Sequence, residues 1–294
     1  MTFRGTYTAL ITPFRDGKID VPALQALIER QIAGGITGIV PVGTTGESPT
    51  LDFDEHIEVI RLAAEFANGR CQVVAGTGAN ATKEAIELTQ AAEKAGATGT
   101  LQVCPYYNKP SQEGLYQHFK AIASETALPV MLYSVPGRSG IEIGVDTTAR
   151  LAADCPTIVS IKEAGGSVER VNQLVHALPA DFSVLSGDDP LTLSFMVSGA
   201  VGLVSVAGNI IPETMSRLVN LCLAGDFNAA AALHKETYPL LKGLMSLDVN
   251  PVPIKMAAAL MGHCTNEFRL PLVPMTGEGP AKLAALLREF SLLS

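Results

Sequence analysis

Short apolar runs rich in β-branched residues alternate with longer amphipathic stretches through most of the chain, and this alternation constrains the fold more than any other feature. Such runs predict strands buried on both faces, as in a parallel sheet, and the stretches between them predict covering helices. The expected strands are Thr6–Ile11, Gly38–Val42, Gln72–Ala75, Thr100–Val103, Val130–Tyr133, Ile158–Ile161, Ser183–Leu185 and Gly202–Val206. The expected helices include Val21–Ala33, Phe53–Ala67, Lys83–Ala95, Gln112–Thr126 and Val168–Leu178.

Eight strands alternating with helices fit either a doubly wound sheet or a (β/α)8 barrel, and the strand count together with the length of 294 residues favours the barrel. Beyond about Leu223 the strand pattern stops, and three further helices are expected at Phe227–Met245, Pro253–Met261 and Gly279–Leu293. We therefore predict an α/β fold in which residues 1–224 form a catalytic (β/α)8 TIM barrel. Residues 225–294 are expected to form a C-terminal helical extension that packs on the barrel or on a neighbouring subunit.

Composition and charge argue against several classes of partner. The net charge is -8, from 21 basic and 29 acidic residues, whereas binding to nucleic acid or an anionic membrane needs a clustered basic surface. The five cysteines are widely spaced without a C-x-x-C pair, and the five histidines show no metal-ligand spacing. We expect a cytoplasmic protein with reduced thiols, no metal, no transmembrane segment and no nucleic-acid partner.

The sixth apolar run ends in a lysine, Lys162, at the edge where barrel enzymes assemble their active sites. Burial disfavours the charged ammonium and lowers its pKa, and a neutral amine can attack a carbonyl carbon to form a Schiff base. The alternative is a lysine that reaches the barrel rim or pairs with Glu163 or Asp188. This segment alone leaves both interpretations open.

Two glycine-containing loops follow neighbouring strands. The loop Gly43-Thr44-Thr45-Gly46-Glu47 places two hydroxyls between two glycines, which suits a carboxylate, although an ordinary turn with a capping threonine has the same pattern. The loop that begins at Gly76 fits the dinucleotide-binding fingerprint G-x-G-x-x-A. Because no acidic residue closes the next strand, we expect no nicotinamide cofactor.

Tyrosines and one arginine stand at the ends of the fourth and fifth strands. Tyr106 and Tyr107 follow the fourth strand, Tyr133 ends the fifth, and Arg138 lies in the loop after it. Phenol hydroxyls both donate and accept hydrogen bonds, so tyrosines near a nucleophilic lysine can form a proton relay, although packing is their commoner role. Arg138 is able to bind a carboxylate through two hydrogen bonds, or to form a local salt bridge on the surface.

Taken together, these motifs resemble the dihydrodipicolinate synthase (4-hydroxy-tetrahydrodipicolinate synthase) family of the pyruvate-dependent Schiff-base aldolase superfamily. The resemblance covers nearly the whole chain, and its segments occur in the same order and spacing. They are Val42–Glu47, Ala75–Asn80, Pro105–Asn108, Ser111–Gly114, Tyr133-x-x-Pro136-x-Arg138, Ile161–Ala164 and Ser186–Asp189. The resemblance implies condensation of pyruvate with L-aspartate 4-semialdehyde in lysine and diaminopimelate biosynthesis, without a cofactor.

The resemblance also implies roles for particular residues. Lys162 forms the imine with pyruvate, and Tyr133, Thr45 and Tyr107 form a proton relay in which Tyr107 comes from a neighbouring subunit. Pyruvate is held through its carboxylate, and Arg138 binds the carboxylate of the semialdehyde. The substrate-binding residues implied in this way are Thr44, Thr45, Arg138, Gly187 and Val204.

Regulation and assembly are further implications of the resemblance. Many family members are inhibited by lysine at a subunit interface, and the matching effector positions here are His56, Asn80, Glu84 and Tyr106. Phe53 stands where lysine-sensitive members more often carry a polar residue. A homotetramer built as a dimer of dimers is expected from the family.

Two alternative functions share part of this pattern. A pyruvate-dependent aldolase of the same superfamily, such as an N-acetylneuraminate or 2-keto-3-deoxy sugar acid lyase, uses the same lysine and tyrosine. A non-catalytic sensor of small acids would need the Gly-Thr-Thr loop but not Lys162, Tyr133 and Tyr107 together.

Overall fold

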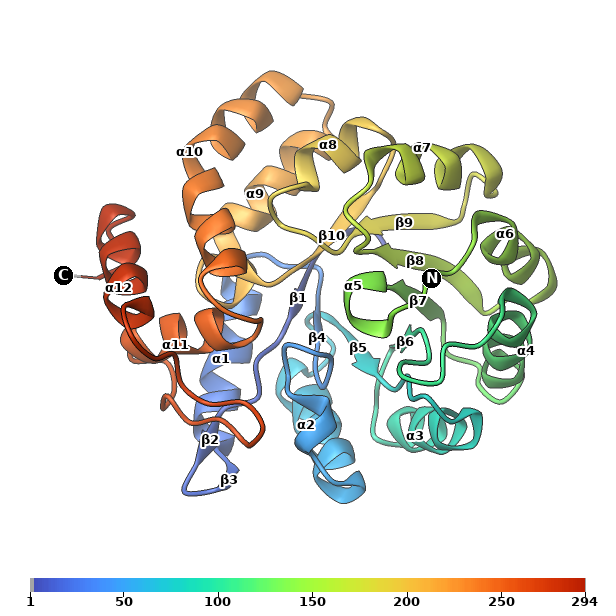
Figure 1. Ribbon diagram of the computed structural model, residues 1–294, viewed down its shortest axis with the longest axis horizontal. Helices are drawn as coiled ribbons and strands as arrows, with labels where there is room; N and C mark the ends of the chain where they lie inside the picture. The colour runs from blue at the N-terminus through green and yellow to red at the C-terminus, as the bar shows by residue number, and fades with distance from the viewer. Residues whose placement is uncertain (1–2, 294) are drawn as a thin grey trace.

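A closed parallel barrel forms the centre of the molecule, and helices surround it (Figure 1). The computed structural model describes residues 3–293. Within this range eight strands close the barrel in the order β1-β10-β9-β8-β7-β6-β5-β4, with β4 paired to β1. The barrel strands are β1 (Gly5–Ala9), β4 (Gly38–Val40), β5 (Gln72–Gly76), β6 (Gly99–Val103), β7 (Val130–Ser134), β8 (Ile158–Glu163), β9 (Ser183–Ser186) and β10 (Gly202–Ser205). The predicted (β/α)8 TIM barrel is therefore confirmed.

The helices that cover the barrel begin and end close to the positions expected from the sequence. The Asp52 side chain accepts a hydrogen bond from the Glu55 N–H and closes a capping box at the start of its helix, and the Ser111 hydroxyl caps the helix that follows it. The main helices are α1 (Val21–Ala33), α2 (Phe53–Ala67), α3 (Thr82–Lys94), α4 (Gln112–Ala123), α6 (Val145–Asp154), α7 (Val168–Ala177), α8 (Thr192–Val197) and α9 (Pro212–Leu223). The short helix α5 (Pro136–Ser139) and the 3₁₀ turns η1 (Ser48–Thr50) and η2 (Ala207–Asn209) lie in loops after strands.

One small element was not expected from the sequence. The segments β2 (Phe14–Arg15) and β3 (Lys18–Ile19) form an antiparallel hairpin between β1 and α1. With two residues in each strand, the hairpin is too short to produce an alternating apolar pattern.

Side chains fill the barrel interior, so the barrel is a packed core and not a pore. The interior cluster includes Tyr7, Met131, Leu185 and Val204, and a second and larger cluster lies between the strands and the helices. A filled interior leaves space for a ligand only at the ends of the barrel, and active sites of this fold lie at the carboxyl ends of the strands.

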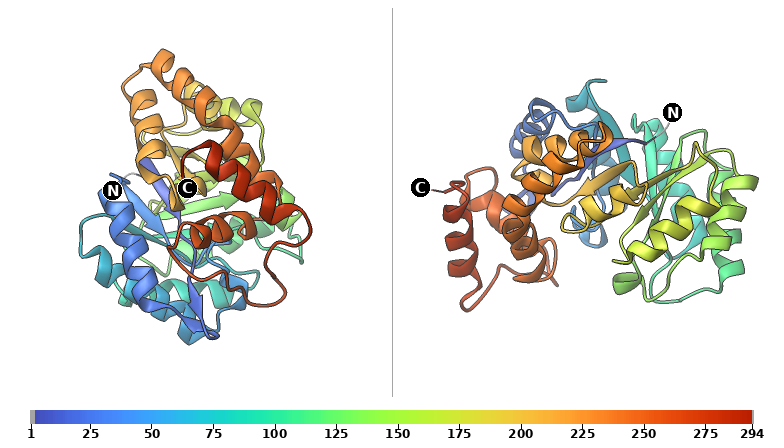
Figure 2. Two further views of the ribbon diagram at one scale, coloured as in Figure 1. Left: turned by 90° about the vertical axis from the view of Figure 1, so that its left-hand side faces the viewer. Right: turned by 90° about the horizontal axis from the view of Figure 1, so that it is seen from above.

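Three helices follow the last covering helix and lie together on one side of the barrel (Figures 1 and 2). They are α10 (Phe227–Ser246), α11 (Val252–Leu260) and α12 (Gly279–Glu289), and the boundary expected at residue 224 falls between α9 and α10. These helices contact one another, and α11 also contacts η2 at the end of β10. In the part of the chain that the structure describes, no helix has the length and hydrophobicity needed to cross a membrane.

Candidate active site

Lys162 lies inside the carboxyl end of the barrel. It is the fifth residue of β8, its exposed fraction is 5 %, and its Nζ atom lies 4.2 Å from the centre of the Tyr133 ring. The register of the sheet produces this contact, because Lys162 and Tyr133 are paired positions of β8 and β7. The burial of Lys162 beside Tyr133 agrees with the first of the two interpretations of this residue, and its role as a nucleophile stays a prediction.

The two carboxylates expected as alternative partners of Lys162 have other partners. Glu163 points to the opposite face of the strand, where it accepts hydrogen bonds from Arg170 Nε (2.8 Å) and from the Gly165 N–H (2.7 Å). Burial raises the pKa of Glu163, and the Arg170 guanidinium opposes this shift. Asp188 lies in the cavity wall, where its carboxylate accepts a hydrogen bond from the Leu191 N–H at 3.2 Å.

A cavity of about 380 Å³ opens above Lys162 and brings together most of the predicted site residues. Its wall includes Lys162, Tyr133, Thr44, Thr45, Arg138 and Gly187. A side chain at position 187 would place its Cβ atom 2.9 Å from Lys162 Cε and 2.7 Å from the Ala164 Cβ. Glycine is therefore required at this position to leave space for the lysine.

Val204 is placed differently from the expectation. Its exposed fraction is 1 %, it packs in the barrel interior, and it is not one of the cavity-lining residues; from this side the wall is formed by Val206. Val206 lies after the end of β10 (Gly202–Ser205), where the chain turns into η2, and it packs with the larger core cluster outside the barrel, whereas Val204 belongs to the interior cluster.

The Gly-Thr-Thr loop is a tight turn that presents two threonines to the cavity. The N–H groups of Gly46 and Ser48 both donate to the Gly43 carbonyl, at 3.0 and 3.3 Å. A Cβ atom on Gly46 would lie 2.9 Å from the Val42 nitrogen. The N–H groups of Gly46 and Ser48 are used within the turn, so Thr44 and Thr45 are the residues of this loop that can bind a ligand in the cavity.

Arg138, on α5, also lines this cavity. Its Nη2 atom donates a hydrogen bond to the Asn250 carbonyl at 3.0 Å, and its side chain is exposed. Within residues 3–293 the hydrogen bonds of this guanidinium thus reach a main-chain carbonyl and not a carboxylate. Such an arginine can exchange its carbonyl partner for a carboxylate of a ligand.

The single chain does not bring Tyr107 to the other relay residues. Its exposed fraction is 92 %, and it is absent from the wall of the cavity that contains Lys162. The backbone of Tyr107 has a φ of 73°, in the left-handed region that a bulky residue rarely adopts. The next residue secures the loop, because Asn108 Nδ2 donates to the Asn80 carbonyl at 2.8 Å.

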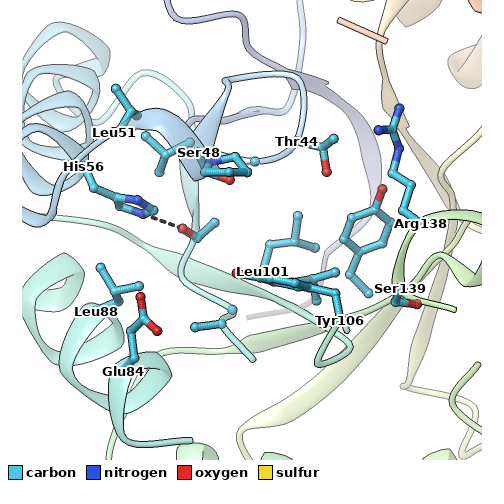
Figure 3. A pocket seen from close by; sticks show the side chains of 18 of the residues that line it. Thr44, Ser48, Leu51, His56, Glu84, Leu88, Leu101, Tyr106, Arg138 and Ser139 are labelled. Carbon is cyan, nitrogen blue, oxygen red and sulfur yellow. Dashed lines mark hydrogen bonds between the residues drawn. The ribbon is translucent and has the colours of Figure 1, made fainter. Parts of the chain in front are cut away.

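A second cavity of about 430 Å³ adjoins the first and contains three of the four predicted effector residues (Figure 3). His56 and Glu84 lie on one side of it, Thr44 and Arg138 lie on the other, and Tyr106 contributes to its wall. The fourth residue, Asn80, is not in the wall, but its Nδ2 atom donates to the Tyr106 carbonyl at 3.3 Å.

The polar groups of this second cavity are affected by burial. His56 Nε2 donates to the Gly76 carbonyl at 2.7 Å, and burial lowers the pKa of His56. Burial and the nearby Glu84 carboxylate raise the pKa of Tyr106. Thr44, Tyr133 and Arg138 line both cavities, so the two spaces share a wall.

Two residues of the C-terminal helical segment hold the Gly-Thr-Thr loop, and sequence reasoning missed both. Asn250 Nδ2 donates to Thr45 Oγ1 at 3.0 Å. Lys255 on α11 forms an ion pair with Glu47 at 2.5 Å, and both side chains are fully buried. Lys255 carried the same signal as Lys162, a single lysine in an apolar run, whereas nothing in the spacing around Asn250 indicated its contact.

The buried ion pair has further partners. Lys255 Nζ lies 4.1 Å from the centre of the Phe14 ring, and Glu47 Oε2 accepts a hydrogen bond from the Arg269 N–H at 3.2 Å. Burial lowers the pKa of Lys255, and the Glu47 carboxylate opposes this shift. The pair connects the loop that presents Thr44 and Thr45 to a helix more than two hundred residues later in the chain.

The sequence matches the model of the dihydrodipicolinate synthetase family over residues 2–290. The 4-hydroxy-tetrahydrodipicolinate synthase of Persephonella marina is 50 % identical over 292 residues, which cover 99 % of each chain. The structure of the 4-hydroxy-tetrahydrodipicolinate synthase from Methylacidiphilum fumariolicum SolV is 55 % identical, with a TM-score of 0.97 over 98 % of this chain and 96 % of that chain.

The fold and the sequence also match a solved complex. The dihydrodipicolinate synthase from Acinetobacter baumannii, whose structure contains pyruvate, is 44 % identical, with a TM-score of 0.96 over 99 % of this chain and 100 % of that chain. The barrel, the position of Lys162 and these full-length similarities agree, and the chain belongs to the dihydrodipicolinate synthetase family.

Proposed function

We propose that this chain is an enzyme that condenses pyruvate with L-aspartate 4-semialdehyde through a Schiff base on Lys162, the reaction of a 4-hydroxy-tetrahydrodipicolinate synthase. The observation that carries the proposal is the buried Lys162 at the carboxyl end of β8, in one cavity with Tyr133, Thr44, Thr45 and Arg138. The full-length relatives carry the name of this activity, which supports the same substrates. The reaction belongs to lysine and diaminopimelate biosynthesis.

The first half of the proposed reaction activates pyruvate. The Lys162 amine attacks the C2 carbonyl, and loss of one water gives the imine; loss of a C3 proton then gives the enamine. Thr44 and Thr45 hold the pyruvate carboxylate. Tyr133 and Thr45 move the protons, together with Tyr107 supplied by a neighbouring subunit.

The second half forms the carbon–carbon bond. The enamine C3 adds to the aldehyde carbon of the semialdehyde, whose oxygen takes a proton and becomes a hydroxyl. The substrate amino group then attacks the imine carbon, closes the ring and releases the Lys162 amine. Arg138 holds the semialdehyde carboxylate, so that the aldehyde faces the enamine. No cofactor takes part in these steps.

The test of the imine is reduction with borohydride in the presence of pyruvate. We expect a stable mass adduct on Lys162 in the wild-type chain and no adduct in Lys162→Ala. A wild-type chain that forms no adduct would instead be a sensor of small acids, and the proposal would be refuted.

The second substrate is tested separately, because sialic acid and keto-deoxy sugar acid lyases use the same imine. We expect pyruvate consumption with L-aspartate 4-semialdehyde and no cleavage of N-acetylneuraminate or of 2-keto-3-deoxy sugar acids. Arg138 favours the semialdehyde, since a guanidinium matches a carboxylate and a polyhydroxylated aldehyde needs hydroxyl partners. Faster cleavage of a sugar acid would make the chain an aldolase.

Assembly and regulation are part of the same proposal. A cytoplasmic homotetramer, a dimer of dimers, would bring the exposed Tyr107 of one subunit to the site of another, so dilution to the monomer should abolish activity and preserve the circular dichroism spectrum. Lysine is proposed to bind in the second cavity, with Glu84 holding its ammonium above Tyr106. Activity that millimolar lysine leaves unchanged would exclude this regulation.

A further inference from the structure

The Gly-Thr-Thr loop has an unusual backbone conformation at both of its ends. Val42, which precedes the loop, has a φ of 51°, and Glu47, which ends it, has a φ of 57°. Both values lie in the left-handed region, which costs free energy for a residue with a side chain and most for a β-branched residue such as valine. Such strain persists only where the surroundings hold the backbone in place, and it is frequent at sites that bind ligands.

The backbone of Glu47 is bonded directly to one of the two threonines. Its N–H donates to the Thr44 carbonyl at 3.1 Å, and its own carbonyl accepts hydrogen bonds from the N–H and the hydroxyl of Thr50, both at 3.0 Å. A rotation of the Glu47 backbone out of the left-handed region would break these bonds. The conformation of Glu47 therefore determines where Thr44 lies in the cavity wall.

The side chain of Glu47 connects this backbone to the C-terminal helical segment. Its carboxylate pairs with Lys255 of α11 at 2.5 Å and accepts a hydrogen bond from the Arg269 N–H at 3.2 Å. The ring centres of Phe14 and Phe268 lie 4.1 and 5.0 Å from Lys255 Nζ. Because both charged side chains are fully buried, the carboxylate has no water to replace its cation and must stay beside it.

Stability alone does not explain why an ion pair is buried at this place. Replacing a buried pair by apolar residues of similar volume is often neutral or stabilising, because taking two charges out of water is costly. A buried pair does fix a position, since moving one partner away leaves both charges uncompensated. The position fixed here is that of Glu47, the residue that ends the Gly-Thr-Thr loop.

We propose that the Lys255–Glu47 ion pair is a positioning device, which holds the Gly-Thr-Thr loop in the conformation that binds the pyruvate carboxylate. The inference rests on the proposed function, since that function assigns the carboxylate to Thr44 and Thr45. Neither partner of the ion pair lines the cavity that contains Lys162, so the pair acts through the loop and not through contact with the substrate.

The test measures pyruvate binding through the imine that it forms on Lys162. The initial rate of adduct formation with cyanoborohydride reports the fraction of the lysine present as imine, and it is measured at increasing pyruvate concentrations. The variant is Lys255→Met combined with Glu47→Gln, in which both charges are absent. We expect the half-saturating pyruvate concentration to rise about tenfold or more, the contribution of a hydrogen bond to a charged group, and the maximal rate to change much less.

The double variant separates a positioning role from a purely structural one. Removing the second charge should restore much of the stability that Lys255→Met loses, because no uncompensated charge remains. It should not restore pyruvate binding, because the loop still lacks its ion pair. A double variant that labels with the wild-type half-saturating concentration would refute the proposal.

Glu47→Asp gives the same comparison while keeping both charges. The side chain is shorter by one methylene, so the carboxylate can reach Lys255 only if the end of the loop moves. We again expect a higher half-saturating pyruvate concentration. A wild-type value in this variant would also refute the proposal, and this result remains available if the double variant does not fold.

The matched control is Leu287→Ala in α12. Leu287 is fully buried, and truncating a buried leucine destabilises a protein about as much as breaking a buried ion pair. The helix packs on α10 and α11, and Leu287 lines neither cavity. We expect the wild-type half-saturating concentration. A rise equal to that of the double variant would show that general destabilisation weakens pyruvate binding and would overturn the inference.

Failure of the inference can be distinguished from failure of the proposed function. If the wild-type chain forms no adduct with pyruvate, the proposed function and the inference that rests on it both fail. If it forms the adduct but does not consume the semialdehyde, the proposed second substrate is wrong, and the titration still decides the role of the ion pair. If it does both and the variants bind pyruvate as the wild type does, only the role of the ion pair is refuted.

Discussion

Replacing Lys255 by methionine removes one half of a buried ion pair and leaves the Glu47 carboxylate without its cation. Both side chains are fully buried, and their charged atoms lie 2.5 Å apart. In Lys255→Met the carboxylate keeps the hydrogen bond from the Arg269 N–H, which has no net charge. Breaking a buried pair on one side costs about 3–5 kcal/mol, because the remaining charge stays out of water.

This cost is large compared with the stability of a typical protein. The free energy of unfolding is usually about 5–15 kcal/mol, so Lys255→Met should remove a fifth of it or more. We expect a clearly lower midpoint of urea unfolding, followed by circular dichroism. The double variant Lys255→Met with Glu47→Gln removes the second charge as well and should recover about 2 kcal/mol or more.

The control is Lys235→Met, which removes an exposed lysine of α10 and should change the free energy of unfolding by less than about 0.5 kcal/mol. Two results would refute the reasoning: a loss below about 1 kcal/mol in Lys255→Met, or a double variant that is no more stable than Lys255→Met.

Three further outcomes are expected. Gly187→Ala places a Cβ atom 2.9 Å from Lys162 Cε, and the displaced amine should form the pyruvate imine about 100-fold more slowly; borohydride trapping at the wild-type rate would contradict this. Burial lowers the pKa of His118 to about 4 in the folded chain. Between about pH 6.5 and 4, His118 is therefore protonated in the unfolded chain and neutral in the folded chain. The free energy of unfolding should fall as the pH falls through this range. This pH-dependent loss of unfolding free energy approaches about 3 kcal/mol and should be smaller in His118→Gln. Identical slopes of unfolding free energy against pH in the two proteins would exclude this role of His118. Arg138→Ala should raise the KM for the semialdehyde by tenfold or more, about the contribution of a charged hydrogen bond, and the KM for pyruvate much less; equal increases would remove its assigned role.

The sequence predicted the barrel and most of the residues in its mouth because both depend on short-range patterns. Alternating apolar runs define buried strands, and the residue at the end of each run must lie at the carboxyl edge of the sheet. This argument is sufficient to bring Lys162, Tyr133 and the Gly-Thr-Thr loop to one cavity. Val204 was expected at the site from the family resemblance alone; the structure places it in the packed interior, and Val206, which follows the end of β10, lines the cavity.

The contacts that escaped prediction join positions far apart in the sequence. Asn250 and Lys255 reach the Gly-Thr-Thr loop because of how α10 and α11 pack beside the barrel, and no local periodicity encodes this packing. Lys255 could have been recognised as unusual, since an apolar helix that contains one lysine must bury it or expose its apolar neighbours. Its partner Glu47 could not be identified from spacing.

The attachment of the Gly-Thr-Thr loop to α11 limits how this barrel can be recombined with other chains. A chimera cut near residue 224 separates Thr45 and Glu47 from the amide and the ammonium that hold them. Such a hybrid retains its loop geometry only when the donor supplies an asparagine and a lysine at the positions of Asn250 and Lys255. For protein engineering, the useful crossover points are therefore those that keep these two contacts within one parent.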